Sequence, residues 1–248
     1  MKRIFAVAVG TMLFLAACSH MEYSITLEED LSGTATLEMA LDLGKMAHAL
    51  AAMQKTFSGD TTELTEEELA AARTELMVQM DEEEWNEEEA RADASQDLPE
   101  GVELLEFSNA REDLLMQFRI KLGFDHVSKL NQVSIDPSGA AGGAGTPGDE
   151  SQPFGGLEVI EEGNTVVLRN DPLDRIEEQV EEASGQVGPI DGMMESVLED
   201  FSVVFRIDAP FDVVEHNATR QEGRVLIWEY DESSLQEGAD GVFVRYRR

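Results

Sequence analysis

Hydrophobic and polar residues alternate along much of this chain, the period-two pattern of strands that bury one face. Tyr23, Ile25 and Leu27 alternate with polar neighbours, and a second run from residue 34 to Leu43 follows a turn at Asp30-Leu31-Ser32-Gly33. The most regular run extends from Leu114 to Phe124. These runs predict hairpins over residues 22–43 and 102–124. Further strands are predicted at 157–161, 165–169, 201–207, 212–216, 224–230 and 241–247.

Other segments have the longer period of amphipathic helices. Met46, Leu50, Met53 and Phe57 form one apolar stripe, which predicts a helix over about 44–57. Thr65 and Glu68 form a capping box at the start of a second helix. Two more helices are expected, one after Asp171-Pro172 and one from about residue 190. Hairpins interrupted by helices without a βαβ rhythm predict an α+β fold, with a largely antiparallel sheet and helices packed on one face.

The first eighteen residues have a different pattern. Lys2 and Arg3 precede an apolar run over 4–17, which is too short to span a bilayer and ends in small residues before Cys18. Cys18 is the single cysteine of the chain. The pattern resembles a bacterial lipobox, which predicts cleavage between Ala17 and Cys18 and a diacylglyceryl cysteine that is acylated again, for example with palmitate. The alternative is an ordinary signal peptide with an incidental cysteine.

The pattern divides the chain into a signal peptide (1–17), a lipidated N-terminus with a short tether (18–21) and a single α+β domain (22–248). Within the domain we expect an acidic helical segment at about 65–93 and a flexible glycine-rich loop at 136–156. Since no aspartate follows Cys18, the expected location is the outer membrane in a cell with two membranes.

The formal charge of −34 limits the possible partners. Nucleic acid is excluded because phosphate contacts need clustered lysine and arginine. Anionic lipid would repel the domain, so the acyl chains on Cys18 must hold it to the membrane. The basic cluster of Arg245, Arg247 and Arg248 is the segment expected to face that membrane. The acidic run 81–93 is expected to be solvated, with loose Ca²⁺ association as the alternative.

Residues with catalytic or metal-binding chemistry are sparse. The four histidines (His20, His48, His126 and His216) are scattered, and no zinc, nucleophile-elbow or phosphate-loop motif is present. We therefore expect a non-catalytic protein without a metal or cofactor, and the residues alone name no ligand-binding site. Asn217-Ala218-Thr219 is read as a coincidental glycosylation pattern. Trp228 and the methionines at 46, 53, 80, 193 and 194 are expected in the core, although methionine also suits adaptable apolar binding surfaces.

One segment has a family resemblance. Residues 210–230 read PFDVVEHNATRQEGRVLIWEY, which resembles the C-terminal part of LppM-like lipoprotein domains, and the hairpin 22–43 is similar too. The resemblance implies an extracytoplasmic, non-catalytic sheet-and-helix fold that binds lipid or glycolipid. The function expected is therefore an exported lipoprotein that binds a lipidic or amphipathic ligand. The alternative is a lipoprotein that docks an envelope protein partner through its acidic helix or glycine-rich loop.

Overall fold

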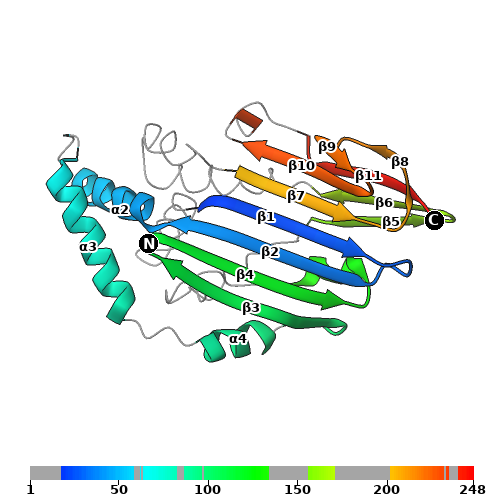
Figure 1. Ribbon diagram of the computed structural model, residues 1–248, viewed down its shortest axis with the longest axis horizontal. Coiled ribbons are helices and arrows are strands. Elements are labelled where there is room, and N and C mark those ends of the chain that lie inside the picture. The colour runs from blue at the N-terminus through cyan, green and yellow to red at the C-terminus, as the bar shows by residue number, and fades with distance from the viewer. Residues whose placement is uncertain are drawn as a thin grey trace.

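A computed structural model describes residues 18–58, 62, 64–82, 87–96, 98–133, 156–170, 202–231, 233–234 and 240–248. Two β-sheets dominate this part of the chain (Figure 1). The larger sheet has seven strands in the order β3-β4-β2-β1-β7-β10-β9, and the smaller has four in the order β5-β6-β11-β8.

The larger sheet contains the two hairpins expected near the N-terminus. Its strands are β1 (Cys18–Leu27), β2 (Gly33–Asp42), β3 (Val102–Glu112), β4 (Leu115–Phe124), β7 (Ser202–Asp208), β9 (Arg220–Glu222) and β10 (Val225–Asp231). Neighbouring strands are antiparallel except β1 and β7, which run parallel. β1 is the middle strand of the seven, with β2 on one side and β7 on the other.

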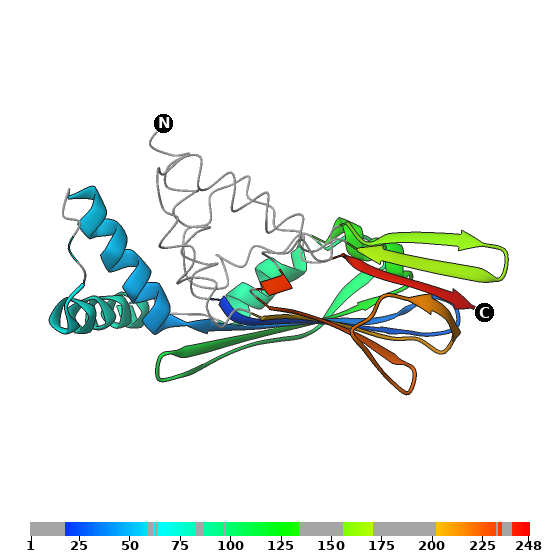
Figure 2. The ribbon, with the colours of Figure 1, turned by 90° about the horizontal axis from the view of Figure 1, so that it is seen from above.

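The smaller sheet is fully antiparallel. Its strands are β5 (Glu158–Glu162), β6 (Thr165–Asn170), β8 (Asp212–His216) and β11 (Val242–Arg247). Figure 2 shows this sheet stacked over one half of the larger sheet, beside the 3-10 helix η1 (Val127–Gln132). A single hydrophobic cluster joins both sheets, with Phe205 and Trp228 from the larger and Leu168 and Tyr246 from the smaller.

Three α-helices complete the described fold: α2 (Leu43–Phe57), α3 (Glu66–Glu82) and α4 (Glu87–Gln96). α2 and α3 pack on each other at one end of the larger sheet, around a second cluster of Leu43, Ala47 and Leu76 (Figure 1). α4 packs through Ala90 and Ala94 against the main core. The predicted capping box is confirmed: the Glu68 amide donates to Thr65 Oγ1 at 3.3 Å, and the Thr65 amide donates to Glu68 Oε2 at 2.7 Å.

The α+β composition and the mostly antiparallel strands agree with the sequence prediction. The covering layer differs, because the smaller sheet lies over half of the apolar face where helices were expected. Alternation identifies a strand but not the sheet it joins, so the sequence did not separate β5, β6, β8 and β11 from the others. The helices predicted after residues 171 and 190, and nearly all of the loop 136–156, lie outside the described residues.

Candidate functional site

The two ends of the larger sheet are defined by its register. At one end Cys18 pairs with Leu41, Leu41 pairs with Met116, and Met116 pairs with Arg111. At the other end Leu27 pairs with Gly33, and Gly33 pairs with Phe124. These are called the Cys18 end and the Leu27 end below.

β1 begins at Cys18, so the expected tether is part of the strand. The hydroxyl of Ser19 donates to the carbonyl of Ala40 at 3.1 Å, and His20 Nδ1 lies 2.8 Å from Ser202 Oγ. The first strand was expected to start at Glu22, and this was too late by four residues. Ser19 and His20 are polar, but two neighbouring strands give their backbone and side-chain groups hydrogen-bond partners.

The apolar face of the sheet is less tightly closed towards the Cys18 end. One cross-strand row there consists of Phe118, Met39, Met21, Val203 and Tyr230. Met39 and Tyr230 are 5% and 6% exposed, and Met21 is only half-buried. A second cross-strand row lies four residues further along β1, towards the Leu27 end. It consists of Leu122, Ala35, Ile25, Ile207 and Leu226, and none of these is more than 1% exposed.

Methionine is concentrated in the more open part. Met21 and Met39 are direct partners on β1 and β2, and Met116 lies one row nearer the Cys18 end. Methionine side chains are flexible and polarizable, so they adapt to apolar ligands of irregular shape. This methionine patch (Met21, Met39 and Met116, with Phe118 and Tyr230) is the candidate binding surface for an apolar ligand.

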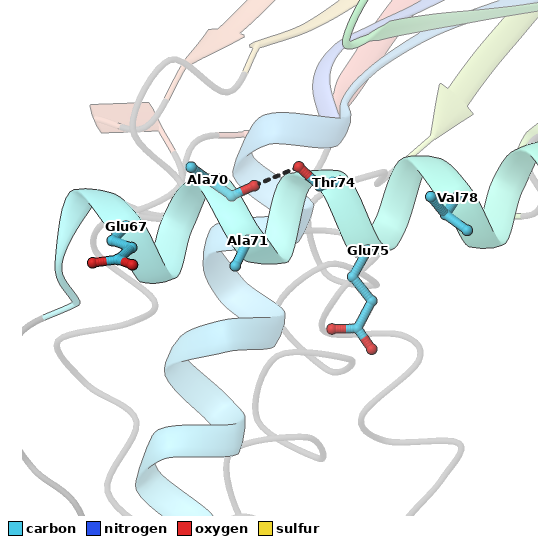
Figure 3. Close-up of a pocket in the computed structure, with 6 residues that line it drawn as sticks. All are labelled: Glu67, Ala70, Ala71, Thr74, Glu75 and Val78. Carbon is cyan, nitrogen blue, oxygen red and sulfur yellow. Dashed lines mark hydrogen bonds between the residues drawn. The ribbon is translucent and has the colours of Figure 1, made fainter.

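α3 has a shallow hollow on its outer side, shown in Figure 3. It is lined by Glu67, Ala70, Ala71, Thr74, Glu75 and Val78. Val78 is 50% exposed, while the Thr74 hydroxyl donates to the Ala70 carbonyl of its own helix at 2.8 Å. The floor of this hollow is therefore apolar, and its two glutamates leave the rim acidic.

The C-terminal arginines lie at the Leu27 end, which contradicts the expectation that they face the membrane next to the lipid anchor (Figure 1). Arg248 forms an ion pair of 2.8 Å with Glu161, whose carboxylate also lies 3.2 Å from His126 Nε2. His126 lies two residues after the end of β4, far from the residues that pair with Cys18. Arg245 pairs with Glu215 at 2.5 Å, so two of the three cations are already engaged within the smaller sheet.

The histidines do not form a common site. His20 and His126 lie at opposite ends of the larger sheet, and His216 accepts a hydrogen bond from the Ala218 amide. His48 is exposed on α2. Among the described residues there is no group of three or more ligands that could hold a metal ion.

Trp228 is 1% exposed, as predicted for a core residue, and its partner is Asn217. Asn217 Oδ1 accepts from Trp228 Nε1 at 2.7 Å and from the Phe243 amide at 2.9 Å, and its Nδ2 donates to the Gly241 carbonyl at 2.6 Å. One side chain thus joins a strand of each sheet. The sequence analysis gave Asn217 no structural role. It noted this residue in a coincidental glycosylation pattern and within the segment that resembles LppM-like domains.

Four ionisable groups in the described part of the chain have shifted pKa values, and the shift is large for Asp231 and Tyr246. Hydrogen bonds from Ser233 and Ser234 lower the pKa of Asp231 to about 2. Burial, with a smaller contribution from the Asp208 charge, raises the pKa of Tyr246 well above its usual range. Tyr246 is fully buried, and its hydroxyl has no hydrogen-bond partner among the residues that the structure describes. Because this hydroxyl stays protonated, it has no role as a base at neutral pH.

The outer face of the larger sheet is polar, and ion pairs lie near its centre. Glu22 and Glu38 are direct cross-strand partners, a repulsive arrangement when alone. Arg206 pairs with Glu22 at 2.7 Å, and Arg119 pairs with Glu38 at 2.8 Å and with Glu106 at 3.3 Å. These ion pairs offset the repulsion.

The other site expectations have mixed outcomes. Met46 and Met80 pack against the core as expected. The side chain of Met53 and the whole of Met193 and Met194 lie outside the described residues. The acidic run 81–93 falls partly on the end of α3 and the start of α4. In the described part of the chain, no helix is both long enough and apolar enough to cross a membrane.

Comparison with solved structures shows a distant similarity in fold. No protein-family profile matches the chain, and no curated protein matches it. Among solved structures, the chain is similar to the folded domain of LppM from Mycobacterium tuberculosis, determined by NMR. The TM-score is 0.42 at 16% sequence identity, over 93% of this chain and 90% of that chain. A superposition at this level assigns neither a ligand nor a function.

Proposed function

We propose that this protein is an exported, non-catalytic lipoprotein, anchored to a bacterial envelope membrane through acyl chains on Cys18. The observation that supports anchoring is the position of the single cysteine, which is both the last residue of the lipobox pattern and the first residue of β1. In a cell with two membranes, the proposed location is the outer one. The mature protein purified from its own membrane should therefore lack residues 1–17 and carry the mass of a lipid-modified N-terminus.

The proposed activity is binding of a lipidic or amphipathic ligand at the methionine patch. The patch lies on the apolar face at the end where β1 begins, and its residual exposure contrasts with the closed row around Ile25. An acyl chain there would bury apolar surface on contact, which stabilises binding by about 0.8 kcal/mol for each CH₂ removed from water.

The second candidate function is docking of an envelope protein on α3. The hollow around Val78 supports it, because an apolar floor with an acidic rim suits a basic amphipathic helix. The two functions require different surfaces, so two matched substitutions separate them.

Native mass spectrometry on the protein from its own membrane tests both functions. We expect a non-covalent lipid adduct that dissociates on activation. Met21→Gln should reduce the occupancy of the adduct, and Val78→Gln, another apolar-to-amide change, should leave it unaltered. Loss of a stoichiometric protein partner in Val78→Gln, with no lipid adduct in either variant, would support the docking function instead.

A further inference from the structure

We propose that Asn109 selects the head group of the apolar ligand by accepting a hydrogen bond from a hydroxyl group of that ligand. The inference rests on the proposed binding of an amphipathic ligand at the methionine patch. It adds which polar group the ligand carries and at which end of the patch that group lies. Asn109 belongs to β3, the strand at one edge of the larger sheet.

Asn109 extends the cross-strand row that contains most of the methionine patch. It pairs with Phe118 on β4, and Phe118 pairs with Met39 on β2. Directly opposed residues of neighbouring strands point to the same face of a sheet, so the amide side chain of Asn109 lies on the apolar face beside Phe118. A polar residue therefore ends this row at the β3 edge.

The amide oxygen of Asn109 is buried without a donor. Its Oδ1 atom is shielded from solvent and accepts no hydrogen bond from the residues that the structure describes. The side chain of Phe118 has no donor, and neither have Ala90 and Ala94, through which the helix next to β3, α4, packs on the core (Figure 1). A buried acceptor without a donor destabilises a protein, so a ligand that brings a donor removes this cost.

The opposite end of the row has its polar group already engaged. The hydroxyl of Tyr230 donates to the Asp240 carbonyl at 3.3 Å. Five spacings between neighbouring strands, at about 4.8 Å each, separate Asn109 from Tyr230 by roughly 24 Å. An extended acyl chain can lie along this distance. The head group is therefore assigned to the Asn109 end, with the chain directed towards Tyr230.

The charges near Asn109 favour a hydroxyl over other polar groups. Arg111 is the next residue on the same face of β3, since it pairs with Met116 of the patch, and its charge would repel an ammonium group. A carboxylate has no donor for Asn109 Oδ1 and would add a negative charge to a chain whose formal charge is −34. An uncharged hydroxyl supplies the donor without either penalty.

Native mass spectrometry with two matched lipids tests this selection. The mature protein purified from its own membrane is mixed in detergent with equal amounts of glycerol monopalmitate and methyl palmitate. Both are esters of the same acyl chain, and only the first has hydroxyl groups. Wild-type protein should bind about fivefold more of the glycerol ester, the ratio that one net hydrogen bond gives.

Two variants separate the head group from the chain. Asn109→Leu should bring the ratio of the two esters to about one, whereas Met21→Gln should lower the binding of both and keep the ratio. The melting temperature of Asn109→Leu should not fall, because the substitution removes a buried acceptor that lacks a donor. A clear fall would show that Asn109 has a structural partner and would overturn the inference.

The same measurement distinguishes failure of this inference from failure of the proposed function. Equal binding of the two esters by wild-type protein would overturn the role of Asn109 alone, as would stronger binding of palmitate than of the glycerol ester. Binding of none of these lipids would overturn the proposed ligand site and the selection built on it.

Discussion

The two ends of the larger sheet are built from the same strands but differ in what closes them. At the Leu27 end, the smaller sheet and η1 cover the apolar face, and the row around Ile25 is almost completely buried (Figure 2). Towards the Cys18 end, methionines and Tyr230 keep some exposure, and α2 and α3 pack on each other around a separate small cluster. The Leu27 end is therefore the more completely closed of the two, and the Cys18 end is the one at which we propose that an apolar ligand binds.

The largest effect is expected from a substitution that removes the proposed anchor at the Cys18 end. Cys18→Ser should leave an unprocessed or released protein, since stable attachment requires two or more acyl chains at about 0.8 kcal/mol per buried CH₂. Membrane fractionation with intact mass measurement checks this. A variant that still fractionates with membranes and keeps the wild-type mass would refute the lipobox interpretation.

Truncation of one side chain at each end compares the two ends directly. Ile25 and Met21 lie on the same face of β1, but Ile25 is 1% exposed and Met21 is half-buried. Ile25→Ala should lower the free energy of unfolding by about 2–5 kcal/mol because it leaves a cavity. Met21→Ala should cost about 1 kcal/mol.

Urea unfolding measures the loss of stability in the two variants, and native mass spectrometry measures their occupancy by the lipid adduct. For the adduct the order should reverse, with Met21→Ala losing more occupancy than Ile25→Ala. Equal losses of stability would show that the two ends are equally well packed.

A smaller effect is expected at the joint between the two sheets. Asn217→Ala leaves the Trp228 indole N–H and the Phe243 amide without their acceptor, at a cost of about 1–3 kcal/mol for each group that stays buried. Asn164→Ala is the matched control, since Asn164 sits in an exposed turn and donates to the Arg248 carbonyl. Thermal unfolding should show a clear decrease for position 217 and little change for position 164.

The smallest expected effect depends on pH at the Cys18 end. The pKa of Asp231 is about 2 in the folded protein, below the ordinary 3.8, because Ser233 and Ser234 donate to its carboxylate. Its contribution to stability is therefore complete above about pH 4 and is lost as the pH falls towards 2. Asp231 is exposed, so the change is small. Asp231→Asn should flatten this part of the stability curve when urea unfolding is measured between pH 2 and pH 5.

Local structure was determined largely by the sequence. The alternation from Leu114 to Phe124 becomes β4, and Thr65 with Glu68 caps α3 as predicted. These features depend on neighbours within a few residues, so the period and the chemistry of the side chains are sufficient. The pattern that resembles a lipobox is equally local, and it predicts modification of Cys18 without reference to the fold.

Tertiary structure alone decided which segments meet. Ser19 and His20 are too polar to predict a strand, but β2 and β7 pair with this segment and extend β1 back to Cys18. The position of Arg248 at the far end follows from pairing with a segment more than eighty residues away. The role of Asn217 depends on Trp228 and Phe243, which lie 11 and 26 residues further along the chain. Register and sheet membership are set by long-range pairing, which a period of two leaves undetermined. The arrangement of the two ends of the larger sheet thus depends on contacts that no local pattern contains.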